Sequence, residues 1–191
     1  MSFDNDKRIL RGAMLAWRGG LSEEERRAAA LGLVETWRYE QPVEPPAVVA
    51  GFWPIAEELD IRPLMIELIN QGCQIALPVV VAKKQPLLFR AWRPGDPLEA
   101  GAFGTLQPTA RRAVVEPEVL IVPLLAVDEE GWRLGYGGGF YDRTLEALRA
   151  RKRVIAVGVG FNEQIVPEVP HDPNDQRLDW LLTDKRACAF V

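Results

Sequence analysis

A glycine-rich segment between an apolar run and a helical pattern is the feature that most constrains the fold of this chain. Residues 133–143 contain four glycines, an apolar run over 119–127 precedes them, and a helical pattern over 144–151 follows. Because glycine has no Cβ, such a loop can turn sharply and direct several backbone N–H groups to one point. The order predicts a strand, a loop suited to a phosphate group, and a helix.

This segment differs from two commoner glycine motifs. It lacks the Gly-Lys-Ser/Thr ending of a P-loop, and Phe140 stands where a dinucleotide fold needs its third glycine. The glycines alone would suit a flexible turn as well as an anion site. Four adjoining residues favour the anion site because they supply two cations, a phenol and a carboxylate. They are Arg133, Tyr141, Asp142 and Arg143.

Apolar runs alternate with helical patterns along most of the chain. Strands are expected at 47–53, 73–81, 87–92, 119–127, 153–159 and 178–182, and helices at 4–17, 22–38, 61–71 and 144–151. Continuous apolar strands that alternate with helices indicate a largely parallel sheet with helices on both faces. We expect an α/β fold whose three layers form a single domain over residues 1–191.

Local signals set the ends of several elements. Ser22 and Glu25 have the spacing of a capping box at the start of the second helix. Asp60 is expected to cap the third helix, and Gly72 is expected to end it. The Pro- and Gly-rich stretch 93–108 is expected to be a long loop.

Composition excludes several classes of partner. The formal net charge of −4 gives no basic field for nucleic acid, so any phosphate recognition must be local. No apolar span reaches the roughly 18 residues of a membrane helix, and the first eleven residues are too polar for a signal peptide. We expect a cytoplasmic protein with no nucleic-acid or membrane partner.

The cysteines and the histidine exclude further chemistries. Cys73 and Cys188 lie far apart without a Cys-x-x-Cys spacing, which argues against structural zinc and against a disulfide framework. Both are expected to be small core residues. His171 is the only histidine, and no Gly-x-Ser-x-Gly sequence is present, so a Ser-His-Asp hydrolase is not expected.

Three loops should meet at one edge of the expected sheet. The glycine loop, the segment after Trp53 and the loop after Gly160 all follow strands. Ligands of open α/β sheets bind in a crevice at the carboxyl ends of the strands. The sequence therefore predicts one site that is built from three separate segments.

With these motifs the chain resembles the 5-formyltetrahydrofolate cyclo-ligase family, also called the 5,10-methenyltetrahydrofolate synthetases. The strongest match comprises 122–128, Gly131 and 133–142. The other matches are Lys7 with Arg11, 57–60, 72–78, 107–108, 161–164 and 175–183. Together they follow the family's order along nearly the whole chain.

The resemblance implies an ATP-dependent ring closure. The formyl oxygen of 5-formyltetrahydrofolate would attack the γ-phosphate of ATP and displace ADP, and N10 would then attack the activated carbon. Phosphate would leave that carbon, which gives 5,10-methenyltetrahydrofolate. Such chemistry depends on in-line placement and on charge stabilisation at the phosphoryl group.

The resemblance also implies roles on the ATP side of the site. Arg133 and Tyr141 would be catalytic, and Asp142 and Asp175 would hold Mg²⁺. Asp172 is the alternative to Asp175 because the stretch 171–175 offers two aspartates. The residues implied to bind ATP are Lys7, Arg11, Arg133, Leu134, Gly135, Tyr136, Gly137, Gly138, Gly139, Phe140, Tyr141 and Asp142.

On the folate side, the resemblance implies flat walls and an acceptor for the pterin ring. Phe52, Trp53 and Phe103 would supply surfaces for stacking, and Glu58 would accept from N–H groups of the ring. From the sequence alone, the first two aromatic residues could equally be core residues at a strand end. Phe103 could equally be an anchor of its own loop.

Three positions depart from the commonest family pattern. Gly138 stands where many relatives have lysine, Tyr136 where some have arginine, and Phe140 where tyrosine is common. These differences bear on rate and affinity more than on reaction type. Two alternatives stay open: a non-catalytic relative that binds a folate or nucleotide, and an enzyme for another phosphorylated or acylated small molecule. The expected partners are the reduced folate and ATP, and the expected state is a monomer.

Overall fold

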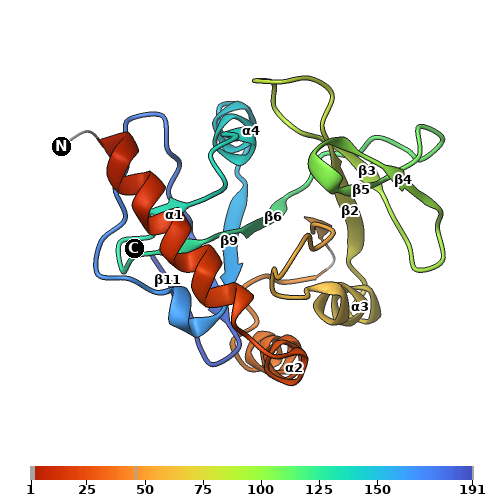
Figure 1. Cartoon of the computed structure of the whole chain (residues 1–191). Coiled ribbons are helices and arrows are strands. Elements are labelled where there is room, and N and C mark those ends of the chain that lie inside the picture. The colour runs from red at the N-terminus through yellow and green to blue at the C-terminus, as the bar shows by residue number, and fades with distance from the viewer. Residues whose placement is uncertain (1–2, 46, 191) are drawn as a thin grey trace.

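The computed structural model describes residues 3–45 and 47–190 and places helices around a central sheet (Figure 1). The α-helices of the described residues are α1 (Phe3–Gly19), α2 (Glu23–Glu40), α3 (Arg62–Asn70) and α4 (Phe140–Arg149). Short 3-10 helices lie at Ala102–Gly104 and Asn162–Gln164. Within these ranges, none of the helices has the length and apolar character needed to cross a membrane.

The central sheet has seven strands in the order β11-β10-β9-β6-β1-β2-β3. Their bounds are β1 (Val48–Ala50), β2 (Gln74–Val79), β3 (Leu88–Ala91), β6 (Val119–Pro123), β9 (Ile155–Gly160), β10 (Trp180–Thr183) and β11 (Ala187–Ala189). Neighbouring strands are parallel except at the two edges, where β3 and β11 run antiparallel to their partners. The sheet is therefore mostly parallel, as predicted.

Helices cover both faces of this sheet. α2 and α3 pack on one face, where Leu33, Trp37 and Leu64 are buried against strand residues. α4 packs on the other face through Leu145 and Leu148. Burial of each such side chain contributes about 2 kcal/mol. The arrangement confirms the predicted α/β fold with helices on both faces.

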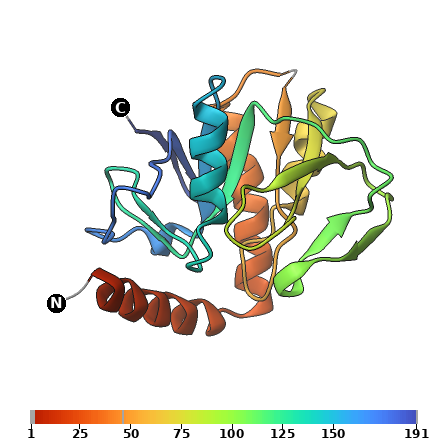
Figure 2. The same cartoon turned by 90° about the horizontal axis from the view of Figure 1, so that it is seen from above.

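The first helix lies across the edge where the parallel strands end (Figure 2). Leu10 and Met14 pack against Ala126 and other buried residues of this region. Farther along the helix, the Trp17 ring meets the ring of Phe161 edge-on, with 5.8 Å between ring centroids. Phe161 directly follows β9. α1 therefore carries side chains from near the N-terminus to the carboxyl ends of the strands.

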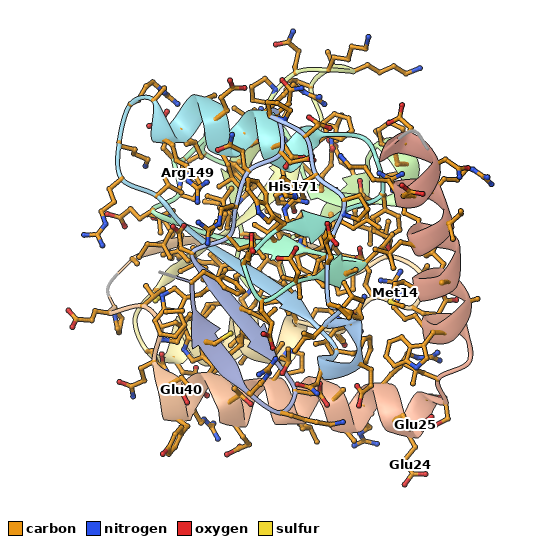
Figure 3. All side chains as sticks on the ribbon, turned by 90° about the vertical axis from the view of Figure 1, so that its left-hand side faces the viewer. Met14, Glu24, Glu25, Glu40, Arg149 and His171 are labelled. Carbon is orange, nitrogen blue, oxygen red and sulfur yellow. The ribbon has the colours of Figure 1, made fainter. Side chains whose placement is uncertain are left out.

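The predicted capping box at the start of α2 is present. The Glu25 N–H donates to Ser22 Oγ at 3.2 Å, and the Ser22 N–H donates to the Glu25 carboxylate at 2.8 Å. Figure 3 shows Glu24 and Glu25 at this end of α2 and Glu40 at the other end. The local pattern thus fixed the start of the helix correctly.

The predicted cap of α3 was wrong. Ile61 is the N-cap and makes no side-chain cap hydrogen bond. Asp60 lies one residue earlier, and its Oδ1 accepts from the Arg62 N–H at 2.9 Å. Gly72 follows the helix with φ +93°, as expected for a residue that ends it.

The segment 93–108 is not a long loop. It contains the antiparallel pair β4 (Leu98–Ala100) and β5 (Leu106–Pro108). Gly95, Gly101 and Gly104 divide this stretch into pieces too short to show an apolar period. The periodicity of apolar residues therefore did not reveal these two strands.

The apolar run 119–127 is also not one strand. β6 ends at Pro123, and β7 (Ala126–Val127) forms a separate antiparallel pair with β8 (Arg133–Leu134). Proline has no N–H to continue the ladder, which explains the break. α4 begins at Phe140 rather than at residue 144, and β11 was not predicted.

The two cysteines are free thiols, as expected. Cys73 is buried in the core on the α2 and α3 side of the sheet. Cys188 is half-buried and packs against the core on the α4 side. No disulfide joins them.

Ser22→Ala should lower the free energy of unfolding by about 1 kcal/mol, because it removes the acceptor of the Glu25 N–H. Urea unfolding followed by circular dichroism measures the loss. Ser22→Thr keeps the hydroxyl and should retain most of the stability. Equal losses in both variants would contradict a role for the cap.

Candidate active site

A cleft of about 860 Å³ opens at the carboxyl ends of the parallel strands. It is lined by residues after β1, by the glycine loop between β8 and α4, and by Asp172, Asn174 and Asp175 of the loop after β9. The expected site residues in its lining are Lys7, Arg11, Phe52, Trp53, Glu58, Phe103, Arg133, Leu134, Gly135, Tyr136, Gly137, Gly138, Gly139, Phe140, Tyr141, Asp142 and Asp175. The fold thus brings together all the residues that the sequence singled out.

The glycine loop turns sharply because two of its glycines adopt the left-handed backbone conformation. Gly137 has φ +93° and Gly139 has φ +63°, a region that other residues rarely adopt. A Cβ at Gly139 would lie 2.7 Å from a guanidinium nitrogen of Arg143, and one at Gly137 would lie 3.4 Å from the guanidinium of Arg11. Gly139 is also the N-cap of α4 and leaves the first N–H groups of the helix without a side-chain cap. The start of α4 therefore has backbone donors that no side chain caps.

Cationic side chains surround this loop. Arg11 Nε donates to the Gly135 carbonyl at 2.8 Å, which ties α1 to the loop. Arg133 is buried, and its Nη2 donates to Asp142 Oδ1 at 2.8 Å. Its guanidinium carbon lies 5.9 Å from the centroid of the Tyr141 ring. Both arginines are held in place before any ligand binds.

Lys7 joins α1 to the loop after β9. Its Nζ lies 2.9 Å from Asp172 Oδ2 and 2.6 Å from Asp175 Oδ2. Burial disfavours the charged amine, but the hydrogen bonds that it donates to Asp175 and Asp172 raise the pKa of Lys7 overall. The same contact lowers the pKa of Asp172 to about 2. Asp172 and Asp175, the two alternatives that the sequence offered, therefore both contact Lys7.

Asp142 and Asp175 each have an oxygen that accepts no hydrogen bond within the described part of the chain. These are Asp142 Oδ2 and Asp175 Oδ1; the other oxygen of Asp142 accepts from Arg133 and from the Gln176 N–H. Carboxylate oxygens suit Mg²⁺, which often binds through one or two carboxylates, waters and substrate phosphates. Residues 3–45 and 47–190 contain no group of three His, Cys, Asp or Glu side chains placed to hold a metal. The donor set fits a Mg²⁺ ion that arrives with a nucleotide.

Arg18 is a residue of this region that the sequence interpretation missed. It is 1% exposed, and it donates from Nη2 to the Tyr136 hydroxyl. Burial raises the pKa of Tyr136 to about 12, and the nearby Glu58 charge adds to the rise, so the phenol stays neutral. Positions 7, 11 and 18 share one face of a helix, so Arg18 lies in line with Lys7 and Arg11. That spacing was the signal that could have found it.

Glu58 is a buried carboxyl on the wall of the cleft that lies near β1. It is 8% exposed, and its Oε2 accepts from the Ile55 N–H at 2.9 Å. Burial raises the pKa of Glu58, while the Ile55 N–H and the charge of Arg18 oppose the rise. One carboxylate oxygen is therefore held by the backbone, and the cleft-facing carboxyl is available to a ligand.

The three predicted aromatic residues lie in different surroundings. Phe52 is 4% exposed and belongs mainly to the core, although it also lines the cleft. Trp53 is half-buried and meets Trp92 edge-on, with 5.8 Å between centroids. Phe103 is 63% exposed, and its ring centroid lies 5.7 Å from that of Phe140. The last two rings have faces that a flat ligand could cover.

The model of the 5-formyltetrahydrofolate cyclo-ligase family matches residues 4–184. The 5-formyltetrahydrofolate cyclo-ligase of Mycolicibacterium smegmatis is 36% identical over 146 residues, which cover 72% of this chain and 74% of that protein. The Escherichia coli (strain K12) 5-formyltetrahydrofolate cyclo-ligase is 35% identical over 150 residues, with coverages of 76% and 82%.

A solved structure is similar along nearly the whole chain. The NMR structure of Aquifex aeolicus 5,10-methenyltetrahydrofolate synthetase superposes with a TM-score of 0.81 at 31% identity. The superposition covers 96% of this chain and 92% of that one. The chain thus belongs to the 5-formyltetrahydrofolate cyclo-ligase family, and it is an enzyme of the ligase class.

Proposed function

We propose that this enzyme converts 5-formyltetrahydrofolate to 5,10-methenyltetrahydrofolate with ATP and Mg²⁺, through a phosphorylated formyl intermediate, and releases ADP and phosphate. The observation that carries the proposal is that the glycine loop and its cations face the same cleft as Glu58 and the aromatic rings. Such a cleft suits a triphosphate at one end and a flat ring with N–H groups at the other. The names of the relatives agree with this substrate.

On the ATP side, the triphosphate would lie against residues 133–142. Lys7 and Arg11 would contact its oxygens, together with the backbone N–H groups of the glycine loop. The N-terminus of α4 adds partial positive charge at the same place. Donors fixed in advance stabilise the charge that develops on the phosphoryl group, which lowers the barrier to its transfer.

Arg133 and Tyr141 would act on the transferred phosphoryl group. The contact with Asp142 holds the Arg133 guanidinium in position. Burial raises the pKa of Tyr141 well above its usual value, so its hydroxyl keeps its proton and can donate. Asp142 and Asp175 would hold a Mg²⁺ ion, which neutralises charge on the phosphate oxygens when it is bound.

On the folate side, Glu58 would accept hydrogen bonds from the pterin N–H groups. Trp53 and Phe103 would stack on the ring, and Phe52 would close the wall behind it. These contacts would hold the formyl oxygen in line with the γ-phosphate, which is the placement that a weak nucleophile needs. The remaining expectations belong to the same proposal: a single-domain monomer in the cytoplasm that acts on small molecules, with no nucleic-acid or membrane partner.

Purified protein should form the methenyl product from 5-formyltetrahydrofolate when ATP and Mg²⁺ are present. The near-ultraviolet absorbance of the product and the release of ADP would be followed together. Omission of ATP, or chelation of Mg²⁺, should stop both signals. If ATP and 5-formyltetrahydrofolate stabilise the protein but no product forms, the protein is a non-catalytic relative and the proposal is wrong.

Asp142→Asn should lower kcat by about 100-fold or more, because a neutral amide neither neutralises Arg133 nor holds Mg²⁺ well. Steady-state kinetics measures the change, and thermal unfolding checks that the variant is folded. Glu116→Gln is the matched control, since Glu116 is an exposed carboxylate paired with Arg151 at 2.8 Å. Nearly normal kcat in Asp142→Asn would remove Asp142 from the site.

The KM for 5-formyltetrahydrofolate should rise as the pH falls through the pKa of Glu58. Burial raises this pKa, so the carboxyl is protonated at a higher pH than an exposed glutamate and then loses its strength as an acceptor. Glu58→Gln should show a high KM with a weaker pH dependence over the same range. Identical pH dependence in the two proteins would show that Glu58 does not bind the folate.

A further inference from the structure

Arg143 lies in the first turn of α4 and lines the cleft, but the reaction described above gives it no role. Its Nη2 donates to the Gly138 carbonyl at 2.6 Å. Its Nη1 lies 2.7 Å from the point that a Cβ of residue 139 would occupy. The guanidinium therefore fills space that is open only because Gly139 has no side chain.

An aromatic ring holds the guanidinium in this place. The guanidinium carbon of Arg143 lies 5.4 Å from the centroid of the Phe140 ring. Phe103 packs on the same ring, with 5.7 Å between centroids. A guanidinium that lies over a ring in a cation–π contact is partly ordered before binding, so it loses less side-chain entropy when it contacts a ligand.

The charge of Arg143 is not neutralised by a carboxylate in the described part of the chain. Lys7 and Arg133 form ion pairs with aspartates of the cleft. Arg11 and Arg143 instead donate to backbone carbonyls. An anion can therefore bind the latter two without competing with a carboxylate.

Most donors of the Arg143 guanidinium also lack an acceptor. Arginine has five N–H donors, and here one of them meets the Gly138 carbonyl. Nε is buried and has no hydrogen-bond partner within the described residues. Phosphate oxygens match the fork of a guanidinium and can accept two of its hydrogen bonds at once.

From this geometry we infer that Arg143 is a phosphate-binding residue for ATP, in addition to Lys7, Arg11 and Arg133. The inference rests on the proposed function, because it adds a residue to the same ATP site. Arg143 would reach the phosphates from α4, whereas Lys7 and Arg11 reach them from α1.

Arg143→Gln should raise the KM for ATP by about tenfold or more, because it removes a charge-assisted contact. The KM for 5-formyltetrahydrofolate should not change. In calorimetry, a non-hydrolysable ATP analogue with Mg²⁺ should bind correspondingly more weakly, while binding of adenosine should be unaffected. Arg151→Gln is the matched control, because Arg151 is exposed and paired with Glu116 outside the cleft, and it should behave like the wild type.

The wild type is assayed first, so that a failure of the proposed function can be distinguished from a failure of the role inferred for Arg143. Absence of product with the wild type contradicts the proposed function. If the wild type is active and Arg143→Gln keeps the wild-type KM for ATP, only the role of Arg143 is overturned. An equal rise in both KM values also overturns it, because the arginine then only shapes the loop.

A folded variant is needed for this test. If thermal unfolding shows that Arg143→Gln does not fold, Arg143→Lys replaces it, since lysine keeps the charge but not the fork. A selective rise in the KM for ATP supports the inference, and an unchanged KM contradicts it.

Discussion

The left-handed backbone at Gly137 and Gly139 is the constraint on which the site depends. It lets the chain pass from β8 into α4 without a Cβ at these two positions, and no side chain caps the first N–H groups of the helix. At Gly139 a Cβ would lie 2.7 Å from Arg143 Nη1, so the arginine side chain would have to move, whereas at Gly137 a Cβ would lie at an ordinary contact distance of 3.4 Å from Arg11. At both positions any other residue would meet an unfavourable φ. The proposed phosphate-binding turn thus depends on the backbone, and the cationic side chains lie around it.

Two of the cations in the cleft are paired with carboxylates before any ligand is present. Lys7 is shared by Asp172 and Asp175, and Arg133 is held by Asp142. Lys7 binds Asp175 through Oδ2, which leaves Oδ1 for the proposed Mg²⁺ ion, and Lys7 also binds Asp172. A lysine with two carboxylate partners could contact a phosphate oxygen and still keep one of them, which limits the cost of a buried charge without a partner. The two Lys7 contacts also join α1 to the loop after β9.

Local signals made much of this structure predictable. The alternation of strands and helices, the cap at Ser22 and the glycine loop are all encoded by neighbouring residues. The meeting of these segments in one cleft was predictable because parallel strands end at one edge, whatever the length of the chain between them. Contacts between distant residues were not predicted. Arg18 donates to Tyr136, which is 118 residues away, and no local pattern identifies that partner. The strands within 93–108 were missed for a related reason, because their pairing is visible only in the three-dimensional structure.

The most direct measurement is a crystal structure with a non-hydrolysable ATP analogue and Mg²⁺. Phosphate oxygens should lie within hydrogen-bond distance of the backbone N–H groups of residues 137–140. Lys7 and Arg11 should contact the same phosphates, and Asp142 should face the metal. Phosphates bound elsewhere in the cleft, with the glycine loop empty or covered by side chains, would contradict it.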